Sequence, residues 1–393
     1  MKLVVFGLAI SSSWGNGHAT LWRGLARALA ANGHDFVFYE RDVPYYAAQR
    51  DLWALPHGRL ELYQSWDEVR VQAARDVDDA DAAMVTSFCP DAASAEQVVL
   101  GSRAPVRAFY DLDTPVTLDQ LARGASVSYI GPHGLREYDI VLSYTGGDSL
   151  VALRERLGAR LAVPLYGSVD PDLHHPVDPI DLFRADVSYL GTYAADRQAT
   201  LERLFHGAAA ALPERRFVLG GSQYPLDFPW SPNIFYMRHV APYLHAAFYS
   251  SSRLTLNVTR AAMAATGYCP SGRLFEAAAC GAPILSDSWP GLDEFFDPGA
   301  EMLVATSTDE AIGAIERSDE ELRAMACRAR ERTLAEHTAA CRAKQLEQIL
   351  CEPSARAAEA AAGPRGREAD ANDHVGIDTS RRGGDADSAA GVL

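Results

Sequence analysis

The chain has 393 residues, of which 48% are hydrophobic and 22% charged, and its formal net charge is −16. This length predicts two domains with sizeable cores and an additional segment, because one domain usually takes roughly 100–200 residues. The acidic balance argues against nucleic acid as the main partner, since phosphate backbones are bound by basic surfaces. The six cysteines are Cys89, Cys269, Cys280, Cys327, Cys341 and Cys351. They form no CxxC pair, so neither a zinc site nor a disulfide framework is predicted.

The N-terminal apolar run, Met1 to Ile10, leads directly into the polar triplet Ser11-Ser12-Ser13. It is too short for a membrane span and lacks the flanks of a signal peptide. It is typical of a buried parallel strand. We therefore expect a cytoplasmic protein without an integral membrane segment.

Strand patterns alternate with helical patterns along the first half of the chain. The expected strands are Lys2–Ile10, Asp35–Tyr39, Ala82–Thr86, Val106–Tyr110 and Asp139–Ser143. The stretch Ala19–Asn32 has apolar residues at helical spacing, and Gly33 ends it. Such alternation predicts an open parallel sheet covered by helices.

A second alternating set follows a segment rich in proline and aspartate between residues 167 and 179, which suits a linker. Its expected elements are the strands Val187–Leu190, Phe217–Gly220, Leu254–Val258 and Pro283–Ser286 and a helix over Gln198–Leu212. The pattern predicts an α/β protein with two doubly wound, Rossmann-like domains, 1–165 and 166–352, facing across a cleft. Large apolar residues nearly vanish after Glu352, so 353–393 is predicted to be a disordered, low-complexity tail.

The most informative segment runs from Gly267 to Asp287, and predicts a loop, a helix opening at Ser271 and a buried strand. Ser271 is a good N-cap, and the helix start together with Arg273 would attract an anion. Glu276 could accept hydrogen bonds from both hydroxyls of a ribose. This is the chemistry of a nucleotide-sugar site. The alternative is a capped core helix whose Glu276 faces solvent.

A glycine-containing loop, with Gly15 and Gly17, follows the first strand and leads to His18. The glycines allow close approach of a ligand to the backbone, although the dinucleotide spacing GxGxxG is absent. We count both glycines among the candidate donor-binding residues. His18 is placed to act as a general base or to contact an anion. It could equally cap the helix start.

Asp111 and Asp113 follow a predicted strand and precede Thr114-Pro115. Two carboxylates without other ligands are weak evidence for a metal. N-capping by Asp113 or Thr114 explains part of the pattern. In the functional interpretation, Asp111 or Asp113 binds or deprotonates an acceptor hydroxyl.

Further candidates for donor binding follow strands of the second sheet. Gly191 and Arg197 would suit a diphosphate. Arg238 lies where the backbone could read a nucleobase edge, and Arg260 ends the strand before the Ser271 loop. Each signal is weak alone, and their common position after strands of one sheet gives them weight.

Taken together, these motifs resemble the spore maturation protein CgeB-like glycosyltransferases, which have the GT-B fold. The resemblance covers roughly residues 1–350. The residues that carry it are Tyr110–Pro115, Val169–His174, Gly191-Thr192-Tyr193 with Arg197, and Ser271–Ala278 with Cys280–Pro283.

This resemblance implies a nucleotide-sugar donor bound mainly by the second domain, an acceptor bound by the first, and no obligatory metal. Many retaining enzymes of this fold have a second glutamate eight residues before the one that matches Glu276. Tyr268 occupies that place here, so the stereochemical outcome stays open.

The sequence thus predicts a metal-independent, hexosyltransferase-like glycosyltransferase without a cofactor, which uses a nucleotide-diphosphate sugar as co-substrate. His18 is the first candidate for the base, followed by Asp111 and Asp113. The acceptor could be a glycan, lipid, protein or small molecule. A nucleotide-sugar epimerase on the same fold and a non-catalytic nucleotide-sugar-binding protein are the alternatives.

Overall fold

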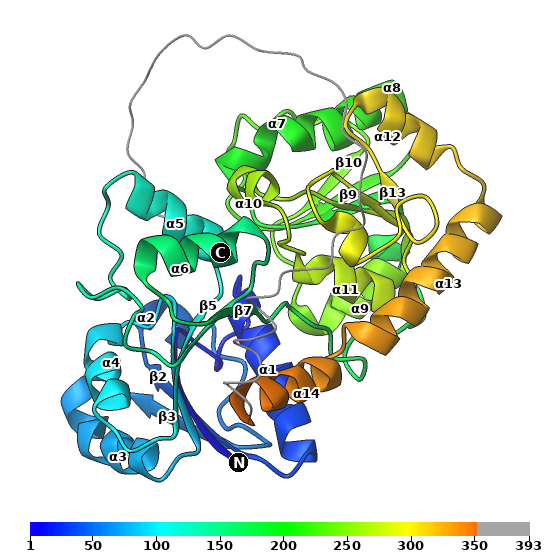
Figure 1. Ribbon diagram of the computed structural model, residues 1–393. Helices are drawn as coiled ribbons and strands as arrows, with labels where there is room; N and C mark the ends of the chain where they lie inside the picture. Colours follow the sequence, from blue (N-terminus) through cyan, green and yellow to red (C-terminus); the bar gives the residue numbers. More distant parts are fainter. Residues whose placement is uncertain (352–393) are drawn as a thin grey trace, which may run out of the picture.

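The structure is a computed structural model that describes residues 1–351. The tail predicted for residues 353–393 lies outside the described residues. The described chain forms two parallel β-sheets, each covered by helices, in two halves of the molecule (Figure 1). This confirms the predicted α/β class.

The first sheet has seven parallel strands in the order β3-β2-β1-β4-β5-β6-β7. Its strands are β1 (Lys2–Gly7), β2 (Asp35–Arg41), β3 (Arg59–Tyr63), β4 (Ala82–Thr86), β5 (Val106–Asp111), β6 (Ile140–Ser143) and β7 (Ala162–Pro164). Its helices are α1 (Gly17–Ala31), α2 (Pro44–Ala47), α3 (Trp66–Asp78), α4 (Ala92–Leu100), α5 (Thr114–Ala122) and α6 (Asp148–Leu157). Helices pack on both faces and bury two apolar cores, one on each side.

The second sheet has six parallel strands in the order β10-β9-β8-β11-β12-β13. Its strands are β8 (Ala185–Leu190), β9 (Phe217–Gly220), β10 (Ile234–Met237), β11 (Ser252–Asn257), β12 (Ile284–Ser286) and β13 (Leu303–Val304). The α-helices are α7 (Gln198–Leu201), α8 (Gly207–Ala211), α9 (His245–Ser250), α10 (Ala261–Thr266), α11 (Gly272–Ala279), α12 (Thr308–Ile315), α13 (Asp319–Glu336) and α14 (Ala339–Cys351). A π-helical turn, Glu202–His206, joins α7 to α8. The helix predicted over Gln198–Leu212 is therefore present as one uninterrupted helical segment.

Both sheets have the same kind of strand order. The first three strands of each sheet are added toward one edge, and the chain then returns to the first strand and adds the later strands toward the other edge. The reversal points lie between β1 and β4 in the first sheet and between β8 and β11 in the second. Ligands of doubly wound sheets bind at this point, beyond the carboxyl ends of the strands. The topology therefore places two candidate half-sites in the molecule.

Strand β1 is shorter than the predicted Lys2–Ile10. One oxygen of the Glu40 carboxylate accepts the N–H groups of Ile10 (2.7 Å) and Ser11 (2.9 Å). Because these amides are satisfied by a buried side chain, the backbone leaves the sheet after Gly7 while Ile10 remains in the core. The apolar run is therefore longer than the strand.

Four strands have no counterpart among the expected strand ranges, and all four are edge strands: β3, β7, β10 and β13. Strand β10 has four residues, two of them exposed. Strand β3 is mostly half-buried, and its sequence Arg-Leu-Glu-Leu-Tyr has two charged residues. Strands β7 and β13 contain three and two residues, too few to show a periodic pattern.

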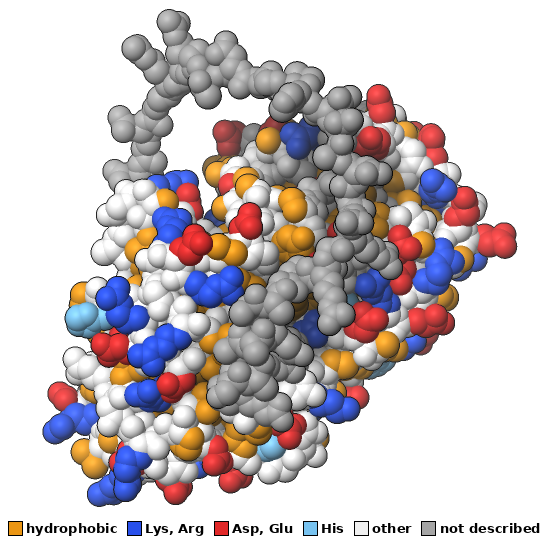
Figure 2. All heavy atoms as spheres, in the orientation of Figure 1, with side chains coloured by type: hydrophobic (Ala, Val, Ile, Leu, Met, Phe, Trp, Pro, Cys, Tyr) orange, Lys and Arg blue, Asp and Glu red, His pale blue; other side chains and the backbone are white. Residues whose placement is uncertain are grey.

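Within residues 1–351, no helix combines the length and the apolar character needed to cross a membrane. On the face shown in Figure 2, acidic and basic side chains are interspersed over both halves of the molecule.

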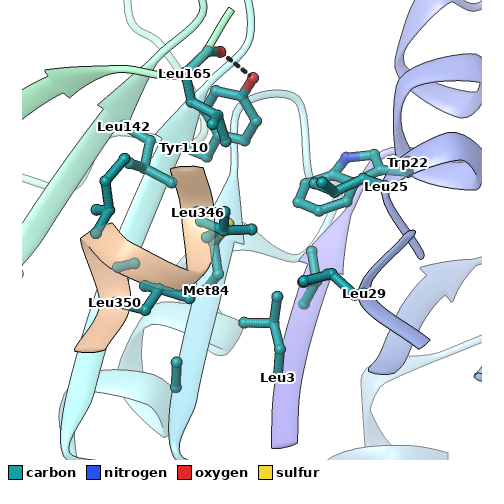
Figure 3. Close-up of a cluster of buried hydrophobic side chains, with 14 of the residues drawn as sticks. Leu3, Trp22, Leu25, Leu29, Met84, Tyr110, Leu142, Leu165, Leu346 and Leu350 are labelled. Carbon is teal, nitrogen blue, oxygen red and sulfur yellow. Dashed lines mark hydrogen bonds between the residues drawn. The ribbon is translucent and has the colours of Figure 1, made fainter. Parts of the chain in front are cut away.

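Helix α14 departs from the predicted division at residue 165. By its place in the sequence it falls in the second predicted domain, yet it packs beside α1 of the first. Figure 3 shows Leu346 and Leu350 of this helix in the same apolar cluster as Leu3, Trp22 and Met84. The described chain thus crosses from the first half to the second and back again.

The two crossings lie side by side and pair through their backbones. Val169 donates its N–H to the His337 carbonyl (3.0 Å) and accepts the N–H of Ala339 (2.8 Å). The buried guanidinium of Arg342 donates to the carbonyl oxygens of Gly167 (3.2 Å) and Glu336 (3.0 Å) and lies 2.9 Å from Nδ1 of His337. One arginine therefore holds both connections between the halves.

His337 must be neutral to accept this hydrogen bond, and its Nε2–H then faces the carbonyl oxygen of Phe295 at 3.3 Å. Burial, reinforced by the charge of Arg342, lowers the pKa of His337 to about 3. The pKa of a histidine in the unfolded chain is about 6.5. The neutral side chain therefore contributes its full stability above about pH 6.5, and this contribution is lost as the pH falls toward the folded pKa.

We expect His337→Gln, which cannot titrate, to remove this pH dependence. Below pH 6 the unfolded wild type binds up to about one proton more than the folded protein, at His337. Its free energy of unfolding should therefore fall relative to that of the variant by up to about 1.4 kcal/mol per pH unit. Urea unfolding between pH 7.5 and 4.5 measures the difference. The exposed His57 offers a matched control, since His57→Gln should keep the wild-type slope. Equal slopes for wild type and His337→Gln would contradict the assignment.

Candidate active site

A cavity of about 330 Å³ lies between the two sheets and is lined by residues of both halves. Its walls come from the loops after β1 and β5 on one side, and from those after β8, β10 and β11 and the start of α11 on the other. All predicted site residues line this cavity except Asp111 and Arg238. The two half-sites expected from the topology therefore meet in one cleft.

The loop after β1 is held rigidly in front of the cleft. Besides the Glu40 contacts, the side chain of Asn16 donates to the carbonyl of Ser12 (3.2 Å) and accepts from the N–H groups of His18 (3.1 Å) and Ala19 (3.4 Å). Asn16 is thus the N-cap of α1. Gly15, at φ +55°, adopts the left-handed conformation that favours glycine.

The prediction that His18 could cap the helix is wrong, because Asn16 has that role and α1 already begins at Gly17. His18 is buried, and its Nε2 lies 3.0 Å from Oδ2 of Asp113, 95 residues along the chain. A carboxylate can only accept, so Nε2 carries the proton in this hydrogen bond. The lone pair of the neutral ring is then on Nδ1, which has no hydrogen-bond partner in the described chain.

Asp113 occupies the N-cap position of α5 but its side chain makes no capping hydrogen bond. The carboxylate points to His18 instead, and only the backbone carbonyl accepts from the helix, from the N–H groups of Val116 (2.8 Å) and Thr117 (3.1 Å). The prediction that the Asp113 side chain caps the helix is therefore wrong. A histidine oriented by a carboxylate is the usual arrangement of a general base.

Asp111 lies beneath this pair, fully buried at the end of β5. One of its oxygens accepts the N–H of Asp113 (3.1 Å), while the other has no partner within residues 1–351. Burial, the largest influence, raises the pKa of Asp111 to about 7. Since it does not line the cavity, this carboxyl supports the loop that carries Asp113 and has no access to a ligand.

On the opposite wall, Ser271 caps α11 as predicted, with its hydroxyl accepting the N–H of Arg273 (3.4 Å). The Arg273 side chain folds back onto the sheet. It donates to the Leu190 carbonyl and to Oδ1 of Asn257 (2.9 Å). This arginine is therefore fixed in place, at the carboxyl ends of β8 and β11.

Glu276 does not face solvent, so the alternative of an exposed glutamate on a core helix is wrong. Its side chain is 16% exposed and lines the cavity, and the hydroxyl of Tyr249 donates to its Oε2 (3.3 Å). Burial alone would raise the pKa of Glu276, but the neighbouring His174, His245 and Arg273 outweigh burial and lower it. Glu276 is thus an ionised, positioned acceptor at the cavity wall.

Among the remaining predicted donor residues, Arg197 lines the cavity, donates to the Thr192 carbonyl (3.2 Å) and leaves its Nε without a partner in the described residues. The N–H of Gly191 is already donated to the Gly220 carbonyl (2.8 Å). Arg260 is paired with Asp196 at 3.1 Å. Of these, Arg197 has the most hydrogen-bonding capacity left for a ligand.

Arg238 is exposed and lies outside the cavity, whereas the next residue, His239, lines it. The ring of His239 stacks on Trp14 of the opposite half, with 3.7 Å between ring centroids. The sequence analysis missed this contact between the halves, because stacking across a cleft leaves no periodic signal in either segment.

Three further residues around Glu276 were also missed: His174, His245 and Tyr249. His174 stands within the linker motif used for the resemblance, but no role was assigned to it. His245 and Tyr249 begin and fill a six-residue helix, which is too short to show which face it buries.

Tyr268, at the place of the absent second glutamate, has a structural part in the cleft. Its carbonyl accepts the N–H of Gly146 (2.9 Å), and the neighbouring Cys269 accepts from the hydroxyl of Thr145 (3.2 Å). These hydrogen bonds join the halves beside the cavity.

A comparison with protein families gives one match, in which the model described as glycosyl transferase-like matches residues 197–348. No curated protein matches the chain. Among solved structures, a sucrose-phosphate synthase from Thermosynechococcus elongatus has a TM-score of 0.65 at 15% identity, covering 91% of this chain and 100% of that one.

Two other solved structures are similar over nearly their full lengths. Anabaena Alr3699/HepE in complex with UDP-glucose has a TM-score of 0.63 at 13% identity and covers 90% of this chain and 100% of its own. The catalytic domain of starch synthase IV from Arabidopsis thaliana, bound to ADP and acarbose, has a TM-score of 0.60 at 12% identity, with 90% of this chain and 99% of that domain covered. The chain therefore has the GT-B fold of these glycosyltransferases, and its C-terminal part is similar to the glycosyl transferase-like family.

Proposed function

We propose that the protein is a glycosyltransferase that moves a sugar from a nucleotide-diphosphate sugar to a hydroxyl acceptor. The observation that carries the proposal is the composition of the single cleft. One wall presents a histidine oriented by a carboxylate, and the other presents a helix start, an arginine and an ionised glutamate. The UDP-glucose and ADP complexes of the similar structures support a nucleotide-linked donor.

The donor is proposed to bind along the second half. Glu276 accepts the ribose hydroxyls through its carboxylate. The N–H groups at the Ser271 cap and the side chain of Arg197 receive the diphosphate, where negative charge develops as the leaving group departs. Arg273 adds fixed positive charge behind them, since its hydrogen bonds to the sheet hold its position.

The acceptor is proposed to bind against the first half, beside His18. The His18–Asp113 pair takes the proton of the attacking hydroxyl, and Asp113 stabilises the imidazolium that forms. In this scheme Asp111 holds the loop and takes no part in proton transfer.

The narrower assignments are also proposals. They are a CgeB-like member of the fold, a hexose as the transferred group, a cytoplasmic location, and turnover that requires no metal or cofactor. The acceptor is a hydroxyl compound of a class that the cavity does not define.

The role of Glu276 is tested by nucleotide binding. Glu276→Ala should weaken the binding of UDP or ADP by about 1.5–3 kcal/mol, the range for a hydrogen bond to a charged group. Isothermal titration calorimetry gives the affinities, and Glu155→Ala, at an exposed position of α6, is the control. Equal affinity for Glu276→Ala and wild type would count decisively against ribose binding.

The role of the His18–Asp113 pair is tested by turnover at saturating donor. His18→Ala should lower the rate by about 10²–10⁴-fold with donor affinity unchanged, because the donor binds the other half. Asp111→Asn should retain most of the rate, since Asp111 has no access to the cavity. If His18→Ala turns over normally while an aspartate variant does not, the base is that aspartate. Assays with donor alone identify an epimerase.

Metal independence is tested by chelation. Turnover in EDTA should equal turnover in added Mg²⁺, because the positive charge at the diphosphate comes from the chain itself. Loss of activity in EDTA that Mg²⁺ restores would contradict this part of the proposal.

A further inference from the structure

Three potential metal ligands converge behind the donor wall of the cleft. They are His174 from the segment after the first crossing, His245 at the start of α9, and Glu276 of α11. One ligand atom from each lies within 4.8 Å of the other two. His245 and Glu276 line the cavity, whereas His174 is buried behind them, 5% exposed.

The hydrogen bonding of His245 turns a lone pair toward this point. Its Nε2 lies 3.2 Å from the carbonyl oxygen of Val240, which only accepts, so Nε2 carries the proton. Its Nδ1 then faces Oε2 of Glu276 at 3.9 Å, too far for a hydrogen bond. In the neutral ring, the lone pair of Nδ1 is therefore directed at this carboxylate.

His174 also has a ring nitrogen that lacks a hydrogen-bond partner in residues 1–351. Its Nδ1 is buried and has no hydrogen-bond partner within the described chain. A buried polar atom without a partner is unfavourable, so a bound group that engages it would be favoured. Within the described chain, the hydroxyl of Tyr249 donates to the Glu276 carboxylate, and neither imidazole is hydrogen-bonded to it.

We propose that His174, His245 and Glu276 bind a divalent transition-metal ion of the zinc type, and that this ion competes with the donor nucleotide for Glu276. Two imidazoles and one carboxylate are a familiar zinc ligand set with an open fourth position. The Val240 carbonyl holds the ring of His245 as outer partners of metal-bound histidines do. Metal binding requires the three ligand atoms to draw closer, because zinc bonds are about 2.0–2.2 Å long.

The metal site itself is independent of the proposed function, whereas the competition depends on the role of Glu276 as the ribose acceptor. An ion held by this carboxylate neutralises it and occupies the space in front of it. Binding of the metal should therefore inhibit transfer, in contrast to a metal that assists the leaving diphosphate.

The site is tested on the full chain, without an affinity tag, after treatment with EDTA and its removal. Calorimetric titration with Zn²⁺, and the visible absorption of Co²⁺, should show one site in the wild type. Loss of a residue that only hydrogen-bonds a metal ligand weakens metal binding by about 10–100-fold. Because His174 and His245 would bind the ion directly, His174→Ala and His245→Ala should each weaken Zn²⁺ binding by more than this. His57→Ala is the control at an exposed histidine, and near-ultraviolet circular dichroism in EDTA establishes that the variants are folded. Unchanged Zn²⁺ affinity in the folded variants would overturn the proposal.

The competition is tested with UDP and ADP in EDTA and at saturating Zn²⁺. Zinc should weaken nucleotide binding to the wild type more than to His174→Ala, because His174 lies outside the cavity and only the metal depends on it. The variant also corrects for zinc bound directly to the nucleotide. Equal zinc effects in both proteins would overturn the competition. Absence of nucleotide binding even in EDTA would instead count against the proposed function and leave the metal titration to decide the site.

Discussion

The cleft depends on the pairing of the two chain crossings between the halves. Val169 pairs with the backbone at His337 and Ala339, and the buried guanidinium of Arg342 spans both segments. Beyond the crossing, α14 packs its apolar side chains into the core of the first sheet. Unfolding this connection would expose buried carbonyl groups and apolar surface together, so the loops after the strands of the two sheets are kept facing each other across the cleft.

This arrangement brings groups of different chemistry to one space. The first half contributes the His18–Asp113 pair on a loop that Glu40 and Asn16 hold rigidly. The second half contributes the Ser271 helix start with Arg273, whose guanidinium is fixed by the sheet. Because these side chains are held by hydrogen bonds to the backbone or to other buried groups, the site is organised before any ligand binds.

Glu276 is at the centre of the second wall. Its side chain is largely buried at the cavity wall, yet its pKa is lowered because His174, His245 and Arg273 outweigh the effect of burial. We propose this carboxylate both as the acceptor for a ribose and as a ligand for a metal ion. The two proposals therefore concern one carboxylate and two mutually exclusive ligands.

The sequence by itself determined the α/β class, most strands of both sheets and the capped helix at Ser271, because each is encoded by local spacing and by turn residues. Most of the candidate site residues that it pointed to line the cavity, since most of them follow strands. Only the tertiary structure decided that Asp113 faces His18 while Asp111 is buried, that His239 rather than Arg238 enters the cleft, and that α14 returns to the first half. These outcomes depend on contacts between residues far apart in the chain, and a local pattern cannot show which of two neighbouring side chains faces the cleft.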